Sequence, residues 1–176
     1  MSLLYPHGQK SEWLAQAKAI TSGKIKTSSS DIPMLIAWLK DMNWPGALEI
    51  SQFLQSYGNE LILPVDTVLK SDDLIWKHWV LAAFADSFDR DFWVPLKDEL
   101  VRIAFKWDPE GAHIDGLYIL AKCRLVNFDQ IMAAVNLMKQ LPESDLEDYQ
   151  KIDALIADKV TTDARMDKVT DALGNQ

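Results

Sequence analysis

The chain of 176 residues carries a formal net charge of −8, and 48% of its residues are hydrophobic. These values are typical of one folded domain with an ordinary core, and they exclude wholesale disorder. An acidic surface repels phosphate backbones, so we expect no nucleic-acid partner. A basic protein would instead be steered toward it.

The first ten residues, MSLLYPHGQK, lack a cationic region followed by an apolar core. No run approaches the roughly 18 uninterrupted apolar residues of a membrane span. We therefore predict no secretory signal, no membrane contact and a cytoplasmic location. The single cysteine, Cys123, excludes an intrachain disulfide, and its apolar neighbours Leu117 and Leu120 predict a buried, inert thiol.

Helical periodicity runs along the whole chain, and no stretch has the strict apolar alternation of a strand. Short helices joined by tight corners favour stacked helix pairs over a four-helix bundle. We therefore predict an all-α fold of short stacked helix pairs, either a HEAT/armadillo-like α-solenoid or a compact helical array. The predicted helices cover residues 11–20, 31–40, 45–57, 59–70, 75–84, 90–106, 109–124, 128–141, 143–160 and 163–173.

The composition divides the chain into three expected parts. Residues 1–30 hold a short helix and a flexible polar linker, whose Gly and Ser residues indicate a boundary. Residues 31–141 form the expected helical-repeat-like core domain. Residues 142–176 form an acidic helical extension whose thin apolar stripe suits docking on the core or on a second copy.

Caps and breakers predict where several helices begin and end. We expect Asp31 to cap the second helix, and Trp44 to lie just outside the third, with Pro45 at its first position. Gly58 predicts a left-handed stop. Pro95 is expected in the first turn of its helix.

Two stretches carry a resemblance to a known family. They are Leu39-Lys-Asp-Met-Asn-Trp-Pro-Gly-Ala47 and Leu69-Lys-Ser-Asp-Asp-Leu-Ile-Trp-Lys-His-Trp79. They resemble a small bacterial family catalogued as domain of unknown function 5071, over residues 31 to about 124. The resemblance implies a compact helical fold akin to HEAT or armadillo repeats. It brings no assigned activity and no catalytic residues, and His78 stands where the family has an aromatic residue.

The same two stretches supply the candidate binding residues. If adjacent helix pairs stack, carboxylates beside indole rings, Trp76 among them, would meet and grip a cationic side chain. The simpler interpretation is that the Asp and Asn residues cap helices, that Trp76 and Trp79 fill the core, and that Asp73 pairs with Lys77 along its helix. The candidate partner-binding residues are Asp41, Asn43, Trp44, Asp72, Asp73, Lys77 and His78.

Other polar residues give no catalytic, cofactor or metal site. Glu110 and His113 alone have metal-ligand spacing on a helix, and two ligands do not make a site, so we expect a solvated helix start there. Asp86, Asp89 and Asp91 lack the glycine and terminal glutamate of a calcium loop, and they indicate a polar corner.

These observations favour a non-enzymatic protein-protein interaction module with an acidic surface. A sharper form of the hypothesis is an immunity protein that neutralises a cognate, basic bacterial toxin. The alternatives are an enzyme on a helical-repeat scaffold, such as a DNA glycosylase, and a structural subunit that homo-oligomerises through its C-terminal helices. A glycosylase needs a basic concave face, which the charge balance opposes.

Overall fold

The computed structural model describes residues 4–141, 146–158 and 161, and this part of the chain is all-α and contains no strand. Residues 150–158 form a further helix after the last named element. No helix in the described part is long and apolar enough to cross a membrane. The α-helices are α1 (Lys10–Thr21), α2 (Ile32–Leu35), α3 (Ala47–Leu54), α4 (Ile62–Lys70), α5 (Leu74–Phe84), α6 (Arg90–Trp93), α7 (Lys97–Ala104), α8 (Ala112–Lys122) and α9 (Phe128–Met138). The 3-10 helices are η1 (Ser29–Asp31), η2 (Ile36–Lys40), η3 (Gln55–Leu61), η4 (Val94–Leu96) and η5 (Leu146–Tyr149).

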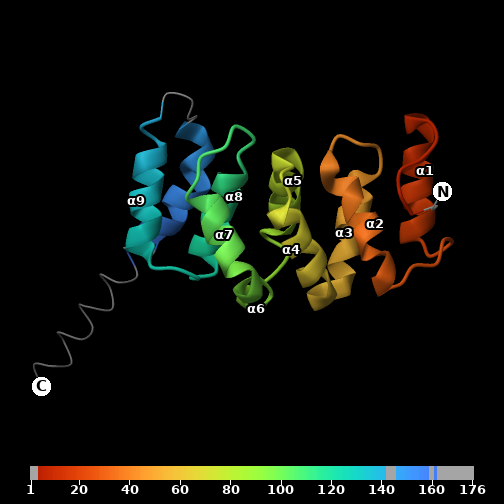
Figure 1. Ribbon diagram of the computed structural model, residues 1–176, viewed down its shortest axis with the longest axis horizontal. Coiled ribbons are helices and arrows are strands. Elements are labelled where there is room, and N and C mark those ends of the chain that lie inside the picture. Colours follow the sequence, from red (N-terminus) through yellow and green to blue (C-terminus); the bar gives the residue numbers. More distant parts are fainter. Residues whose placement is uncertain (1–3, 142–145, 159–160, 162–176) are drawn as a thin grey trace, which may run out of the picture.

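The helices follow one another in chain order along the long axis, from α1 at one end to α9 near the other (Figure 1). Helix α1 packs on α3, and α8 packs on both α5 and α7. The all-α prediction is therefore confirmed. The HEAT/armadillo-like arrangement and the three-part division of the chain stay predictions.

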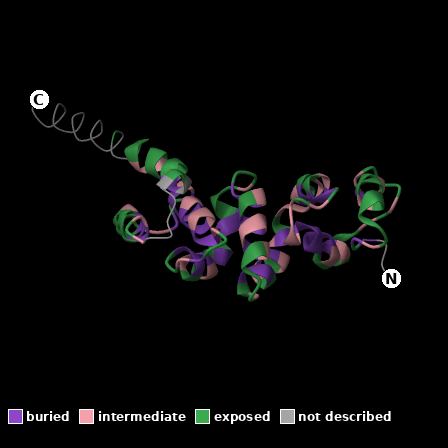
Figure 2. Cartoon of the chain, turned by 90° about the horizontal axis from the view of Figure 1, so that it is seen from above, coloured by how far each residue is buried: buried purple, intermediate pink, exposed green. Residues whose placement is uncertain are grey.

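Buried residues form one core that runs along the middle of this row (Figure 2). Trp38 is fully buried, and its indole Nε1 donates a hydrogen bond of 2.7 Å to the carbonyl of Leu4. Trp13 of α1 contacts the edges of Trp38 and Trp44, with ring centroids 6.4 and 5.2 Å apart. These indole contacts attach the N-terminal segment and α1 to the following helices.

One predicted helix start lies elsewhere, and one residue at a predicted N-cap position makes a different hydrogen bond. Helix α3 begins at Ala47, two residues after Pro45, because Gly46 adopts a left-handed φ of 95° as the N-cap. Asp31 accepts hydrogen bonds from the backbone and hydroxyl of Ser28 (2.8 and 2.9 Å), so it completes a capping box at η1. It makes no side-chain cap on α2.

One predicted break is present, and one helix that was predicted as continuous is interrupted. Gly58 has a φ of 54° and breaks the path inside η3, as expected of a helix stop. The predicted helix 90–106 is divided into α6, η4 and α7. The division falls at Pro95. A proline interrupts a helix because it has no N–H to donate and its ring clashes with the carbonyl four residues earlier.

The described part of the C-terminal extension packs on the body of the chain. Tyr149 and Ile152 are buried, and Lys139, the C-cap residue of α9, forms an ion pair with Asp153 at 2.6 Å. The described part of the segment predicted as helix 143–160 therefore contacts α8 through Tyr149 and the C-cap residue of α9 through Asp153. The predicted helix 163–173 lies outside the described residues.

Candidate functional site

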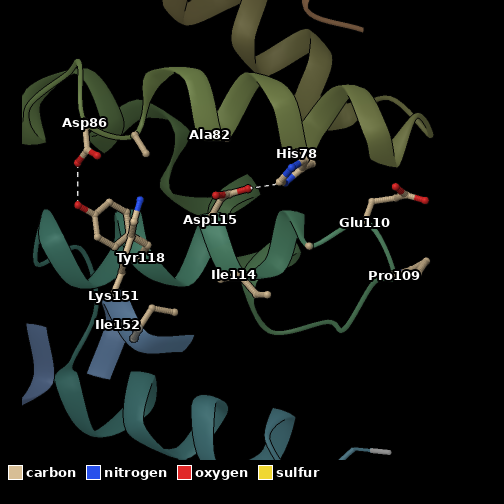
Figure 3. Close-up of a pocket in the computed structure, with 12 residues that line it drawn as sticks. His78, Ala82, Asp86, Pro109, Glu110, Ile114, Asp115, Tyr118, Lys151 and Ile152 are labelled. Carbon is tan, nitrogen blue, oxygen red and sulfur yellow. Dashed lines mark hydrogen bonds and ion pairs between the residues drawn. The ribbon is translucent and has the colours of Figure 1, made fainter. Parts of the chain in front are cut away.

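A cavity of about 340 Å³ lies between α5, α8 and the helix 150–158 (Figure 3). Asp86 and Tyr118 lie at one end, Glu110 at the other, and His78 with Asp115 between them. The carboxylates alternate with apolar wall residues. The lining residues are His78, Ala82, Ala85, Asp86, Pro109, Glu110, Gly111, Ile114, Asp115, Tyr118, Lys151 and Ile152. We call this space the acidic cavity.

His78 and Asp115 form a hydrogen-bonded pair in the middle of the acidic cavity. Nδ1 of His78 lies 2.8 Å from Oδ2 of Asp115, and both side chains are about three-quarters buried. This hydrogen bond raises the pKa of His78 above its ordinary value, because the carboxylate favours the charged imidazolium. Burial raises the pKa of Asp115, and the contact with His78 opposes that rise.

A second polar group closes one end of the acidic cavity. The carboxylate of Asp86 accepts hydrogen bonds from Lys122 (2.6 Å) and from the Tyr118 hydroxyl (2.7 Å). Lys122, and then Tyr118, hold the pKa of Asp86 below its usual range. Burial and the hydrogen bond to Asp86 raise the pKa of Tyr118 to about 12. Nζ of Lys122 and Nζ of Lys151 lie 5.6 and 5.7 Å from the centroid of the Tyr118 ring, so two cations of the chain already lie near this aromatic ring.

The other end of the acidic cavity holds a free carboxylate. Glu110 is exposed, and among the described residues its carboxylate has no hydrogen bond or ion pair. Ile114 and the buried Ile152 line the cavity between Glu110 and Tyr118. The cavity therefore combines an open negative charge with an apolar wall and an aromatic face.

The loop between α7 and α8 is held by a buried polar network. The Asp108 carboxylate accepts hydrogen bonds from the backbone N–H groups of Glu110, Ala112 and His113 (3.0–3.3 Å). Nδ1 of His113 lies 3.3 Å from the same carboxylate, and Nε2 lies 3.2 Å from the hydroxyl of Tyr149. Burial would raise the pKa of Asp108, but the His113 ring and backbone donors lower it below its ordinary value.

This network corrects one expectation. His113 is 2% exposed, so the predicted solvated helix start is wrong. The reason is tertiary, because Tyr149 comes from a segment 36 residues away and covers the ring. His113 therefore links the loop to the C-terminal extension.

A second cavity, of about 260 Å³, lies on the other side of this loop. Pro109 is shared by the two linings. The remaining lining comes from the start of α5, from α7 and from the loop. The residues are Asp72, Leu74, Lys77, Arg102, Ile103, Lys106, Trp107, Asp108, Pro109 and Ala112. We call this space the lysine cavity, because Lys77 is 5% exposed and lines it. Burial, followed by the charge of Arg102, lowers the pKa of Lys77.

The structure divides the predicted binding residues among several places. His78 lines the acidic cavity, whereas Asp72 and Lys77 line the lysine cavity. Asp73 caps α5 by accepting a 3.0 Å hydrogen bond from the backbone N–H of Trp76, and it forms no ion pair with Lys77. The expected pairing of Asp73 with Lys77 is therefore wrong, because Lys77 turns into a cavity.

The residues of the first stretch make one local hydrogen bond and one packing contact with α1. Asp41 accepts a 2.8 Å hydrogen bond from the backbone N–H of Asn43, and Trp44 packs on Trp13. The two stretches do meet, since Nζ of Lys40 lies 4.7 Å from the Trp76 ring centroid. The Trp76 indole also donates a 3.1 Å hydrogen bond to the carbonyl of Ile36.

The core role expected for the two tryptophans holds only in part. Trp76 is half-buried and packs against the core. Trp79 is also half-buried, and its ring lies against His78, with centroids 4.7 Å apart. Trp79 therefore belongs to the surroundings of the acidic cavity more than to the core.

Asp115, Tyr118 and Lys151 are functional candidates that sequence reasoning missed. One signal was present, because Asp115, Tyr118 and Lys122 follow an i, i+3, i+7 spacing that places them on one face of α8. The role of Lys151 had no local signal. Within the described ranges, no three His, Cys, Asp or Glu side chains are grouped so that they could hold a metal ion.

Comparison with known proteins gives one match. The family model described as Domain of unknown function (DUF5071) matches residues 11–115, which is more than half of the chain. The match includes α1, which we expected to lie outside the resemblance. Comparisons with curated proteins and with solved structures gave no match. The chain belongs to the DUF5071 family.

Proposed function

We propose that this protein is a non-enzymatic protein-binding module, and that the acidic cavity takes a lysine or arginine side chain of its partner. The observation that carries the proposal is the free carboxylate of Glu110 at one end of a cavity that has apolar wall residues and the Tyr118 ring at its other end. A long basic side chain has the matching chemistry, because its stem is apolar and its head is cationic. Lys151 supports this, since the chain's own ammonium already lies over that ring.

The charge of the whole chain supports a basic partner. A formal net charge of −8 steers positively charged proteins toward the surface and raises their rate of encounter. Within this proposal, the sharper hypothesis is an immunity protein that neutralises a cognate basic toxin. A toxin gene beside the gene for this protein would support that form, and a neighbour without basic character would count against it.

The test is a binding measurement with the product of the neighbouring gene. The double variant Asp86→Asn and Glu110→Gln removes two cavity carboxylates while keeping side-chain size. We expect it to weaken binding by about tenfold or more, because charge-assisted contacts to the partner are lost. Isothermal titration calorimetry of the full chain would provide the two dissociation constants.

A matched control separates the cavity from general charge. The double variant Glu60→Gln and Asp98→Asn also removes two exposed carboxylates, and neither residue lines the acidic cavity. It should slow association slightly and leave the dissociation rate unchanged. Equal weakening by both double variants would reject the cavity as the binding site and leave only long-range attraction.

The paired His78 and Asp115 favour an enzyme as a second candidate. A buried carboxylate beside a histidine ring is how many hydrolases orient a general base. Assays of the full chain on ester, phosphodiester and N-glycosidic substrates would test this, the last being the substrate of a glycosylase. A rate that disappears in His78→Gln would favour the enzyme over the binding module.

A further inference from the structure

The lysine cavity contains a charged group without a partner in the protein. Among the described residues, the ammonium of Lys77 makes no hydrogen bond and no ion pair within 4.0 Å, although the residue is 5% exposed. The stem of Lys77 is covered, but the ammonium is not enclosed: among the described residues the enclosed side-chain nitrogen without a partner is Nε1 of Trp93, so the Lys77 ammonium meets the space of the cavity. Lys77 is therefore poised to gain a hydrogen-bonding anion.

The neighbouring charges favour an anion over a cation. Arg102 and Lys106 also line the cavity and add positive charge. The Asp108 carboxylate already accepts hydrogen bonds from backbone N–H groups and lies 3.3 Å from the His113 ring, so its oxygens are engaged at the loop and make no ion pair with Lys77. Arg102 donates from Nε to Glu99 and from Nη2 to the carbonyl of Leu69, and these bonds fix its position.

The rest of the lining selects the kind of anion. The cavity also has apolar lining residues, and they are Leu74, Ile103, Trp107, Pro109 and Ala112. Asp72 and Asp108 would repel a doubly charged anion more than a singly charged one. The volume of about 260 Å³ is below the range of roughly 300–1,000 Å³ typical of sites for drug-sized ligands. A small monocarboxylate with an apolar body meets all three conditions.

We propose that the lysine cavity binds a small organic monocarboxylate, with its carboxylate on Lys77 and its apolar body against Ile103 and Trp107. This site is separate from the acidic cavity, and it stands whether or not the protein-binding proposal holds. Binding adds a partner to the Lys77 ammonium and covers apolar wall at the same time.

The test uses benzoate as the probe, with benzamide as its uncharged analogue and inorganic phosphate as a compact anion. The readout is the indole N–H signal of Trp107 in a two-dimensional ¹H–¹⁵N spectrum, assigned with Trp107→Phe. We expect benzoate to shift this signal saturably, and benzamide to leave it unchanged. A shift with benzamide equal to that with benzoate, or no saturation with benzoate, would overturn the proposal.

Two lysine variants complete the test. Lys77→Met keeps the length and apolar character of the stem, and we expect it to weaken benzoate binding about tenfold or more. Lys97→Met removes an exposed lysine of α7 that does not line the cavity, and it should bind benzoate like the unmodified chain.

Unchanged affinity in Lys77→Met would reject the assignment, and so would tighter binding of phosphate than of benzoate. If Lys77→Met does not fold, the comparison of benzoate with benzamide on the unmodified chain still decides the question.

Discussion

Replacing Gly46 with alanine should destabilise the protein through two separate effects. The residue has a φ of 95°, and a left-handed backbone costs an L-residue about 1–2 kcal/mol. A Cβ would also lie 2.4 Å from the Cβ of Ala17 and 3.2 Å from the carbonyl oxygen of Trp13. Such overpacking costs about 1–3 kcal/mol, so we expect a total loss of about 2–5 kcal/mol.

The control for this prediction is Gly23→Ala. Gly23 has a φ of 74°, and a Cβ there would meet nothing within 4 Å. Gly23→Ala should therefore lose only the free energy that a left-handed backbone costs an alanine. The reduced entropy of the unfolded chain affects both variants equally. Guanidinium unfolding followed by far-ultraviolet circular dichroism would measure both free energies. Equal losses in the two variants would refute the close approach of α1 to the start of α3.

A rescue experiment tests the steric part directly. Ala17 is fully buried in α1, and Ala17→Gly removes the methyl group that the new Cβ would meet. Alone, this change should cost about 1 kcal/mol, because glycine weakens a helix interior. Combined with Gly46→Ala, it should cost less than the sum of the two single losses. Strict additivity would show that the two side chains do not meet.

Three further outcomes follow from the polar groups. The hydrogen bond to Asp115 raises the pKa of His78 above its unfolded value, so its stabilisation is complete below about pH 6.5 and is lost as the pH rises through the folded pKa. The free energy of unfolding should therefore fall more steeply above about pH 6.5 in the unmodified chain than in Asp115→Asn, and parallel curves would contradict this. Tyr149→Phe removes the hydrogen bond to His113 and should lower the free energy of unfolding by about 1–3 kcal/mol, measured by thermal or chemical unfolding. An unchanged free energy would show that this bond does not stabilise the fold. Burial raises the pKa of Cys123, so at neutral pH its thiol should react much more slowly with a disulfide reagent in the folded chain than in the unfolded chain.

Helices and their caps could be predicted where the deciding interaction is local. The cap of α5 by Asp73 and the break at Gly58 depend on residues within one turn, and both were expected from the sequence. The start of α3 was misplaced, because Pro45 is compatible with a first helical position. Close packing of Gly46 against Ala17 decides the geometry there, and that contact joins residues 29 positions apart.

Burial of polar groups could not be predicted in the same way. His113 and Lys77 were interpreted as surface residues, yet both are buried. Their burial depends on segments that fold back from elsewhere, Tyr149 over His113 and the α7–α8 loop beside Lys77. A periodic pattern indicates which face of a helix is apolar, but it does not indicate which polar side chain will be covered.

The loop between α7 and α8 lies between the acidic cavity and the lysine cavity, and α5 contributes residues to both. Neighbouring residues of α5, Lys77 and His78, line different cavities, and Pro109 of the loop belongs to both linings. Asp108 holds the loop by binding the backbone at the start of α8 and the His113 ring. Because His113 in turn contacts Tyr149, the position of the loop is tied to the C-terminal segment that carries Lys151. Loss of the Asp108 carboxylate should therefore disturb both cavities together, whereas loss of Lys77 or Glu110 should disturb only one.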